Sequence, residues 1–373
     1  MKARNFGPWA TGLGDDVSTA LSTFWRRRLA RLAAARGGAD RLSRRDVLKL
    51  GLGGAALAAL PTVRSSSALP PAEPKESRIY LYADLRPNGD RDMIQGLLAV
   101  DPDGGSWTKV ADLDGLFRVA PDGKTIAFSK FSSAEGGFAR FDTLWLRPLD
   151  GDGEPRKVAD VGGIPVWSGD GKELIVSQGN IEGRQRGRLR HETWRVGLGG
   201  KGPVKLPVPE PDGVEDWSAD GRWLATVTIR PNDTFKGYHV YVMHPDGTGQ
   251  RCVADEPGTN LFPRFAPDGR RVAYTHMEPL KDNRWGPGSI RVVDLDGKGR
   301  TTIYNEGEDG FPEQLCWSPD GKRLACLLGN RSPRGESPRK LHNDGILIVG
   351  ADGKDARVFP LPSVQFLGAP DWR

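Results

Sequence analysis

The sequence predicts an all-β protein, a six-bladed β-propeller. Three observations support this prediction: the chain repeats itself about every 50 residues, each period holds four short strand-like segments, and one Asp-Gly turn recurs five times. Gly and Pro are frequent, with 49 and 29 residues among 373. This composition favours many turns and short strands over long helices.

The first half of each period is an apolar segment, an Asp-Gly turn and a second apolar segment, as in WSPDGKRL at 317–324. Its copies span 117–130, 165–178, 215–228, 263–276 and 315–328, with turn aspartates Asp122, Asp170, Asp220, Asp268 and Asp320. In such a turn Pro fixes φ, Asp bonds the backbone two residues on, and Gly adopts positive φ at low cost. Five copies of one turn indicate a scaffold rather than five active sites.

The second half of each period is a β-rich segment that ends in another Gly-containing turn. It occurs six times, at 97–104, 144–151, 193–200, 240–247, 290–297 and 346–353. The first half has five complete copies; GAPDWR at 368–373 begins a sixth, and 78–83 resembles a second strand that lacks a first. We therefore expect the C-terminal strand to complete the last blade with N-terminal strands, which closes the ring and removes exposed sheet edges.

The N-terminal region carries an export pattern. Residues 43–60 read SRRDVLKLGLGGAALAAL, in which Arg44 and Arg45 precede a short apolar run. This segment resembles a bacterial twin-arginine export signal. The resemblance implies passage through the twin-arginine translocase and a periplasmic or secreted location, or retention at the inner membrane if the signal is not cleaved. The apolar run is too short for a stable transmembrane span.

We accordingly divide the chain into a basic N-terminal extension at 1–42, a twin-arginine signal at 43–68, a linker at 69–77 and the propeller at 78–373. The first 68 residues carry a net charge of +8, which leaves about −3 for the remaining residues. The propeller therefore has no overall attraction for a polyanion, and nucleic acid is not an expected partner.

Motifs for catalysis or metal binding are missing from the sequence. It has no phosphate-binding loop and no nucleophile elbow, and we expect no cofactor. Cys316 and Cys326 flank one predicted hairpin on opposite faces of the sheet, so we expect no disulfide between them. The histidines come from different blades without metal-ligand spacing, so we expect no metal site and interpret them as surface or rim residues. They are His191, His239, His244, His276 and His342.

The repeated W-S-P-D-G-K-x-L pattern, followed by a strand and a D-x-D-G turn, resembles the TolB-type propeller repeat, a relative of WD repeats. The resemblance covers 78–373 and implies the fold, but it says little about activity because one fold hosts many functions. TolB carries a separate α/β domain before its propeller, and the linker at 69–77 leaves no room for one. We expect a monomeric TolB-like propeller that is not a true TolB.

The two faces of the predicted ring differ. We name the strands of a blade a to d from the axis outward. The a–b and c–d turns share one face, the turn face, and are short and uniform. The d–a and b–c connections share the other, the loop face, and are variable, as functional loops usually are. The d–a connections at 210–216, 254–258 and 305–313 are acidic, and the b–c connections at 182–192, 281–285 and 329–340 are basic.

One position of strand a forms a partly charged ring, which we expect to contribute to a binding site on the loop face. Its residues in blades one to six are Arg118, Val166, Asp216, Arg264, Cys316 and Asp371. Asp216 could reach Arg264, and Asp371 could reach Arg118, because their blades are neighbours. This predicts either pairs that lock neighbouring blades together or a polar channel mouth that binds a ligand.

Our leading hypothesis is an exported, non-catalytic propeller that binds a protein, peptide or glycan of the cell envelope through the loop face. The alternative is a polysaccharide lyase or glycoside hydrolase that uses carboxylates on the same face, such as Glu215, Asp216 or Glu313. The candidate binding residues are Glu215, Asp216, Arg264, Glu313, Arg118, Asp371, Arg184, Arg190, His191, Trp285, Arg334 and Arg339.

Overall fold

The computed structural model describes residues 77–85, 94–103, 105–113, 116–133, 139–150, 153–180, 190–209, 213–228, 237–279, 285–305, 310–330, 345–361, 364–366 and 370–373. The predicted N-terminal extension, the export signal with Arg44 and Arg45, and the linker up to residue 76 lie outside these residues. Every regular element in the described part of the chain is a β-strand, and no helix there is long and apolar enough to cross a membrane.

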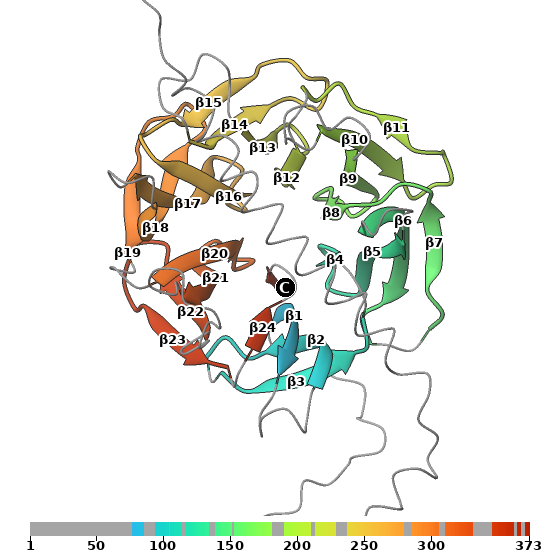
Figure 1. Cartoon of the computed structure of the whole chain (residues 1–373), viewed down its shortest axis with the longest axis horizontal. Coiled ribbons are helices and arrows are strands. Elements are labelled where there is room, and N and C mark those ends of the chain that lie inside the picture. The colour runs from blue at the N-terminus through green and yellow to red at the C-terminus, as the bar shows by residue number, and fades with distance from the viewer. Residues whose placement is uncertain are drawn as a thin grey trace, which may run out of the picture.

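The strands form six antiparallel sheets arranged as blades around one axis (Figure 1). Blade one holds β4 (Leu116–Val119), β5 (Thr125–Ser133), β6 (Ala139–Pro148) and β7 (Arg156–Ala159), and blade two holds β8 (Ile164–Trp167), β9 (Glu173–Asn180), β10 (Arg190–Gly197) and β11 (Val204–Lys205). Blade three holds β12 (Gly213–Trp217), β13 (Leu224–Thr228), β14 (His239–Met243) and β15 (Arg251–Ala254), and blade four holds β16 (Thr259–Phe265), β17 (Arg271–Pro279), β18 (Trp285–Asp294) and β19 (Thr301–Asn305). Blade five holds β20 (Gly310–Trp317), β21 (Arg323–Asn330), β22 (Gly345–Gly350) and β23 (Arg357–Pro360), and blade six holds β1 (Ile79–Leu85), β2 (Ile94–Val100), β3 (Trp107–Ala111), β24 (Val364–Phe366) and β25 (Asp371–Trp372). The predicted all-β, six-bladed propeller is confirmed.

The a–b turns have the hydrogen bonds that the sequence predicts. In blade five, Gly321 N donates to Ser318 O over 2.9 Å, and Lys322 N donates to Asp320 Oδ1 over 3.0 Å. Gly321 has a φ of 68°, a conformation that Gly adopts without steric cost. The same two bonds form around Asp122, Asp170, Asp220 and Asp268. Asp320 is therefore a structural residue of a repeated turn.

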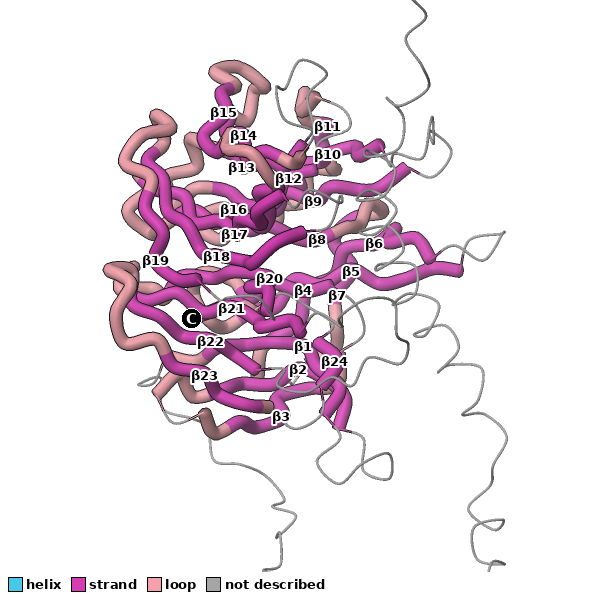
Figure 2. The backbone as a smooth tube through the Cα atoms, turned by 60° about the vertical axis from the view of Figure 1, so that its left-hand side comes forward, coloured by secondary structure: helices cyan, strands magenta, loops and turns pink. Residues whose placement is uncertain are grey.

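The hydrophobic core lies between successive blades, which stack around the ring in the side view of Figure 2. Trp317 illustrates this arrangement, because it is 6% exposed and its Nε1 donates to Arg264 O of the preceding blade over 3.1 Å. Its cluster joins two blades through Ala273, Ile290 and Val292 of blade four and Leu324, Cys326, Leu347 and Val349 of blade five. Burial against neighbours on both faces explains why the b strands are almost continuously apolar.

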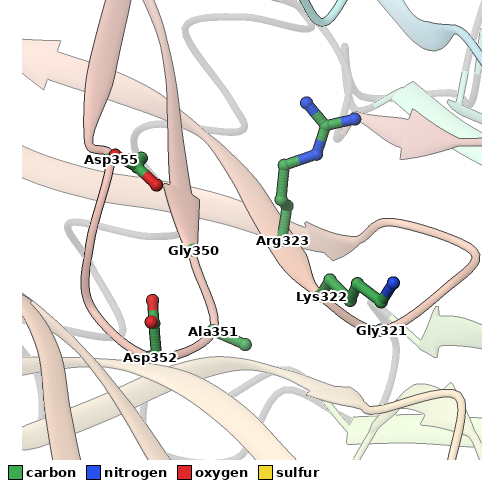
Figure 3. Close-up of a pocket in the computed structure, with 7 residues that line it drawn as sticks. All are labelled: Gly321, Lys322, Arg323, Gly350, Ala351, Asp352 and Asp355. Atoms are coloured by element: carbon green, nitrogen blue, oxygen red, sulfur yellow. The ribbon is translucent and has the colours of Figure 1, made fainter.

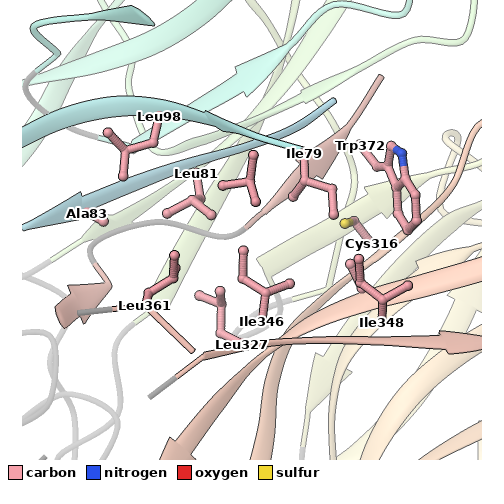
Figure 4. Close-up of a cluster of buried hydrophobic side chains, with 12 residues drawn as sticks. Ile79, Leu81, Ala83, Leu98, Cys316, Leu327, Ile346, Ile348, Leu361 and Trp372 are labelled. Atoms are coloured by element: carbon pink, nitrogen blue, oxygen red, sulfur yellow. The ribbon is translucent and has the colours of Figure 1, made fainter. Parts of the chain in front are cut away.

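The last blade closes the ring as predicted. β25 pairs with β1, where Ile79 lies opposite Trp372, and Arg78 and Arg373 exchange backbone hydrogen bonds of 2.6 and 2.9 Å. Figure 4 shows the apolar side chains at the junction with blade five, namely Ile79, Leu81, Leu98 and Trp372 against Cys316, Leu327, Ile346 and Ile348. Cys316 and Cys326 are free and belong to clusters on opposite faces of blade five, as expected.

Candidate functional site

The charged ring of strand a lies near the turn face. Arg118, Asp216, Arg264 and Cys316 are each the second-last residue of their strand, and an a–b turn follows directly. A strand rises about 3.3 Å per residue, so these residues are at the turn-face end of the inner strands. The assignment of this ring to the loop face is therefore wrong, because strand direction places the end of strand a on the other side.

The two ring carboxylates reach their neighbouring blades but bond the backbone. Phe265 N donates to Asp216 Oδ2 over 2.7 Å, and Val119 N donates to Asp371 Oδ2 over 2.7 Å. Each donor is the residue directly after the expected arginine. No ion pair among the described residues joins Asp216 to Arg264 or Asp371 to Arg118. The ring therefore locks blades together, but through backbone N–H groups.

The ring arginines are also occupied by backbone carbonyls. Arg264 Nη1 donates to Glu215 O over 2.7 Å and to Pro263 O over 2.8 Å, and Arg118 Nη1 donates to Phe117 O over 3.2 Å. Burial, reinforced by the nearby Arg264 guanidinium, lowers the pKa of Arg118 to about 10. Burial raises the pKa of Asp216 from its ordinary value. These buried groups support the structure more than they present charge to a ligand.

Three neighbouring inner strands carry β-bulges that the sequence analysis missed. The pairing register shifts between Val214 and Asp216 in β12, between Leu261 and Arg264 in β16, and between Glu313 and Cys316 in β20. The described pairing of β4 and β8 has no such shift. Bulges often re-aim side chains beside functional sites, and among the inner strands that the structure describes these bulges lie in blades three, four and five.

Two bulge residues have strained backbones. Phe262 and Gln314 have φ values of 55° and 57°, although neither is Gly. Both residues, like Glu215 in the bulge of β12, remain partly exposed on the innermost strand. The Glu215 carboxylate is 29% exposed and lies 3.8 Å from Arg264 Nη1. A polar amide, an aromatic ring and a carboxylate thus lie within the bulges of three adjacent inner strands.

The predicted residues of the loop-face rim are only partly described. His191, near the start of β10, and Glu313 of β20 are half-buried. Arg190 and Trp285 are the first residues of β10 and β18, and their side chains lie outside the described residues, as do all of Arg184, Arg334 and Arg339. The basic rim therefore stays a prediction.

A buried charge network, also missed from sequence, joins blades three and four at the loop face. Glu256, in the connection between β15 and β16, accepts hydrogen bonds at Oε1 from Tyr274 over 2.7 Å and from Arg291 over 3.1 Å. Its Oε2 lies 2.9 Å from Arg300 Nη1, and Arg291 Nη2 donates to Glu278 over 2.8 Å. Glu256 is 9% exposed. The network fixes the connection between the blades, because a buried carboxylate needs such partners.

His276 adjoins this network and is 1% exposed. Its Nδ1 lies 2.8 Å from Asn260 Oδ1, and its Nε2 lies 3.2 Å from Glu278 Oε1. Burial and the positive charge of Arg291 lower the pKa of His276 below its ordinary value. The surface-or-rim interpretation is wrong for His276 and for His239, which is 2% exposed. Both lie in nearly continuous apolar strands, a signal that could have predicted their burial.

A pocket of about 430 Å³ lies on the turn face of blade five (Figure 3). Lys322 and Arg323 of one hairpin and Asp352 and Asp355 of the other line it. Its walls are the repeated turns, and Arg323 forms an ion pair with Asp103 of blade six. The pocket belongs to the scaffold rather than to the variable side of the ring. Within the described residues, no group of three or more His, Cys, Asp or Glu side chains could hold a metal ion.

Similarity to curated proteins covers part of the ring. No family model matches the chain. It is 32% identical to a Protein TolB homolog of Chlorobium luteolum over 85 residues, which are 22% of this chain and 18% of that protein. It is 27% identical to Dipeptidyl-peptidase 5 of Porphyromonas gingivalis over 137 residues, which are 34% of this chain and 19% of that protein. The matched parts span less than a fifth of these relatives.

Solved structures match more of the chain. A TolB structure from Agrobacterium tumefaciens has a TM-score of 0.51 and 21% identity, covering 78% of this chain and 90% of its own. TolB from Acinetobacter baumannii has a TM-score of 0.57 and 16% identity, and the match covers 79% of this chain and 66% of that one. Identities this low show the fold alone. The chain is a closed propeller with a structural inner ring and two unlike faces. More particularly, it is a TolB-like six-bladed β-propeller.

Proposed function

We propose that the chain is an exported, non-catalytic propeller that binds a protein, peptide or glycan of the cell envelope through its loop-face half. The observation that carries this proposal is the difference between the two faces. The turn face repeats one hydrogen-bonded Asp-Gly turn around the ring. The loop face holds connections of unequal length, such as 255–258 and 331–344. A rigid scaffold with variable loops on one side is a common design for a binding protein.

Charge on the loop face supports the recognition of a polar partner. The Glu278 and Asp255 carboxylates are 51% and 73% exposed. Arg291 and Arg300, which also contact the buried Glu256, hold them in place. Side chains held this way lose little conformational freedom when a partner binds. The predicted basic connection at 329–340 would add charge of the opposite sign at the same face.

The alternative of a carboxylate-dependent lyase or hydrolase has weaker support. Asp216 lies near the turn-face end of β12 and bonds Phe265 N, whereas Glu313 lies further toward the loop-face end of β20. A glycosidase needs two carboxyl groups roughly 5 to 9.5 Å apart across the scissile bond. Asp216, half-buried and bonded to the backbone of the next blade, does not suit that role. Release of reducing sugar or unsaturated product from envelope polysaccharides, lost in Glu313→Gln, would favour the alternative.

Export by the twin-arginine translocase is the second part of the proposal. Its support is the Arg44–Arg45 pair and the apolar run that follows it. The full chain with Arg44→Lys and Arg45→Lys should accumulate in the cytoplasm, whereas the unchanged chain should be recovered from the periplasm or medium. Equal export of both chains would contradict the use of this signal.

Binding is tested by photo-crosslinking of the full chain in intact cells. A photoreactive residue at His191, Asp255 or Glu278 should capture one defined envelope component. The same residue at Lys322 or Asp355 on the turn face is the matched control and should capture none. Equal capture from both faces, or a component captured only from the turn face, would overturn the loop-face assignment.

A further inference from the structure

We propose that the bulges of β12, β16 and β20 form a carbohydrate-binding arc on the inner wall of the ring, with Glu215, Phe262 and Gln314 as its contact residues. The inference rests on the proposed function as a binding module and names its ligand class. It assigns the site to one side of the ring, blades three to five, where the inner strands depart from regular pairing.

The geometry begins with the extra residue in each strand. An inner strand pairs with strand b along one edge and faces the axis along the other. Regular residues of strand a point toward neighbouring blades and are buried there, as in β4 and most of β8. An extra residue breaks this alternation and turns a side chain out of the blade interface. That explains why Glu215, Phe262 and Gln314 are partly exposed while Val214, Leu261 and Leu315 are buried.

Backbone strain indicates selection for something other than stability. Phe262 and Gln314 hold φ values of 55° and 57°, where a residue with a Cβ is disfavoured and Gly is not. Many Gly residues occupy such conformations elsewhere in the described chain. A bulky aromatic ring and a long amide at equivalent places in adjacent blades therefore carry a cost that their side chains must offset.

Arg264 is the positioning residue of the arc. It is 6% exposed and donates to Glu215 O over 2.7 Å and to Pro263 O over 2.8 Å, so one guanidinium supports the bulges of blades three and four. Trp317 Nε1 donates to Arg264 O and connects the same residue to blade five. The Arg264 side chain thus links the bulges of blades three and four, and its backbone carbonyl adds a bond to the end of β20 in blade five.

The side chains match a neutral, hydroxyl-rich ligand. A carboxylate and an amide oxygen accept hydrogen bonds from hydroxyl groups, and the amide N–H₂ donates to them. An aromatic ring packs on the apolar C–H face of a sugar ring. The Glu215 charge is partly balanced by Arg264 at 3.8 Å, which makes the arc a weak site for a simple cation.

The proposal is tested by ligand-detected NMR of the full chain with a panel of neutral oligosaccharides: β-glucans, chito-oligosaccharides and mannans. At least one should bind, and Phe262→Gly, Gln314→Gly and Glu215→Gln should each weaken that binding about tenfold or more. Phe262→Gly and Gln314→Gly should also keep or raise the melting temperature, because Gly relieves the strain at positive φ.

Asp355→Gly is the matched control. Asp355 is the third described non-Gly residue with positive φ, 55°, and it lies on the turn face. This variant should gain stability without any change in sugar binding. If all three Gly variants gain stability but only Phe262→Gly and Gln314→Gly lose sugar binding, the lost binding reflects a lost ligand contact rather than the relief of backbone strain.

Each other outcome counts against a defined part of the proposal. If no neutral oligosaccharide binds, the carbohydrate assignment is overturned. If sugars bind and all three variants bind equally well, the arc is overturned. If the captured envelope component is a protein or peptide whose binding these variants weaken, the arc remains but its ligand class is wrong. Loss of loop-face crosslinking without loss of sugar binding would instead contradict the broader proposed function.

Discussion

The junction that closes the ring and the junction between blades three and four use the same bond at the same position. In both, an aspartate of strand a accepts a hydrogen bond of 2.7 Å from the next blade, at Val119 for Asp371 and at Phe265 for Asp216. They differ in what surrounds that bond. The chain joins both pairs of blades, from β15 to β16 and from β3 to β4, but the inner strands differ: β12 continues through an a–b turn into β13, whereas the C-terminal strand β25 is held in blade six by non-covalent pairing with β1.

The closing junction compensates with additional bonds from the last residues. Arg373 donates to Val119 O from Nε and Nη2 over 3.2 and 3.1 Å, and it forms an ion pair with Asp371 at 3.0 Å. Trp372 Nε1 donates to Ser77 Oγ over 2.6 Å. The comparison teaches that one repeated bond suffices where the chain is continuous, but that closure concentrates several polar bonds on three C-terminal residues.

The largest expected effect follows from Asp371→Ala. The substitution leaves Val119 N–H without its buried partner and removes the carboxylate that faces Arg373, so unfolding free energy should fall by about 3 kcal/mol. Urea denaturation of the full chain measures this loss. Asp160→Ala, at an exposed ion pair with Lys157, is the surface control and should change stability by less than about 0.5 kcal/mol. If the two variants lost the same stability, the bond between Asp371 and Val119 N would not account for the stability of the closing junction.

How much of this was predictable from sequence depends on the kind of interaction. The repeat period predicts the blades, the shared last blade and the position of the Asp371 contact, because repeated residues occupy repeated places. It did not predict that Asp371 bonds Val119 N rather than Arg118. That choice depends on the stagger between neighbouring strands, which residue spacing does not contain.

The bulges and the Glu256 network show two further limits. A bulge is a property of the pairing between two strands, so the local sequence around Phe262 and Gln314 does not reveal the extra residue. Glu256 was recognised only as part of an acidic connection, because its partners Tyr274, Arg291 and Arg300 come from different strands. The burial of His276, by contrast, was within reach of sequence reasoning, since it ends an almost wholly apolar segment.

The internal junction should be less sensitive. Asp216→Ala should reduce unfolding free energy by about 2 kcal/mol through the unpaired Phe265 N–H, because the a–b turn still joins β12 to β13 within its blade. An equal or larger loss than in Asp371→Ala would show that chain continuity contributes nothing to this junction.

Asp216→Asn adds a pH test to the same junction. Burial raises the pKa of Asp216 in the folded protein, so its contribution to stability is fully present below the ordinary value of 3.8 and is lost as pH rises through the folded value. The Asn variant has no such charge, so its free energy of unfolding should increase relative to that of the unchanged protein as pH rises from 3.5. Urea denaturation across pH 3.5 to 7 measures the difference. A stability difference that stays constant with pH would contradict the raised pKa.

The connection between blades three and four should also be acid-sensitive through His276. Burial and Arg291 lower its pKa from 6.5, so the unfolded chain takes up the proton first. The stability that depends on a neutral His276 imidazole is fully present above pH 6.5, and it is lost as pH falls through the lowered pKa of His276 in the folded protein. His276→Gln should lose less stability than the unchanged protein between pH 7.5 and 5, measured by thermal unfolding. His244→Gln, on the turn face, should follow the unchanged protein; identical profiles for all three would reject the assignment.

The smallest expected effect concerns the cation–π contacts that join blades outside the charged ring. Arg323 of blade five lies 4.9 Å from the ring centroid of Trp372 in the closing strand, and Arg271 of blade four lies 5.5 Å from that of Trp317. Both arginines are about a third exposed, so each contact should contribute about 0.5 to 1 kcal/mol.

Arg323→Met keeps the apolar contact and removes the charge, which also ends the exposed pair with Asp103. Arg271→Met also ends an exposed ion pair, with Asp268 of its own turn. If closure depends more on each contact than an internal junction does, Arg323→Met should lower the melting temperature slightly more than Arg271→Met. A larger decrease in melting temperature for Arg271→Met would indicate that the additional stability of the closing junction comes from Asp371 and Arg373 alone.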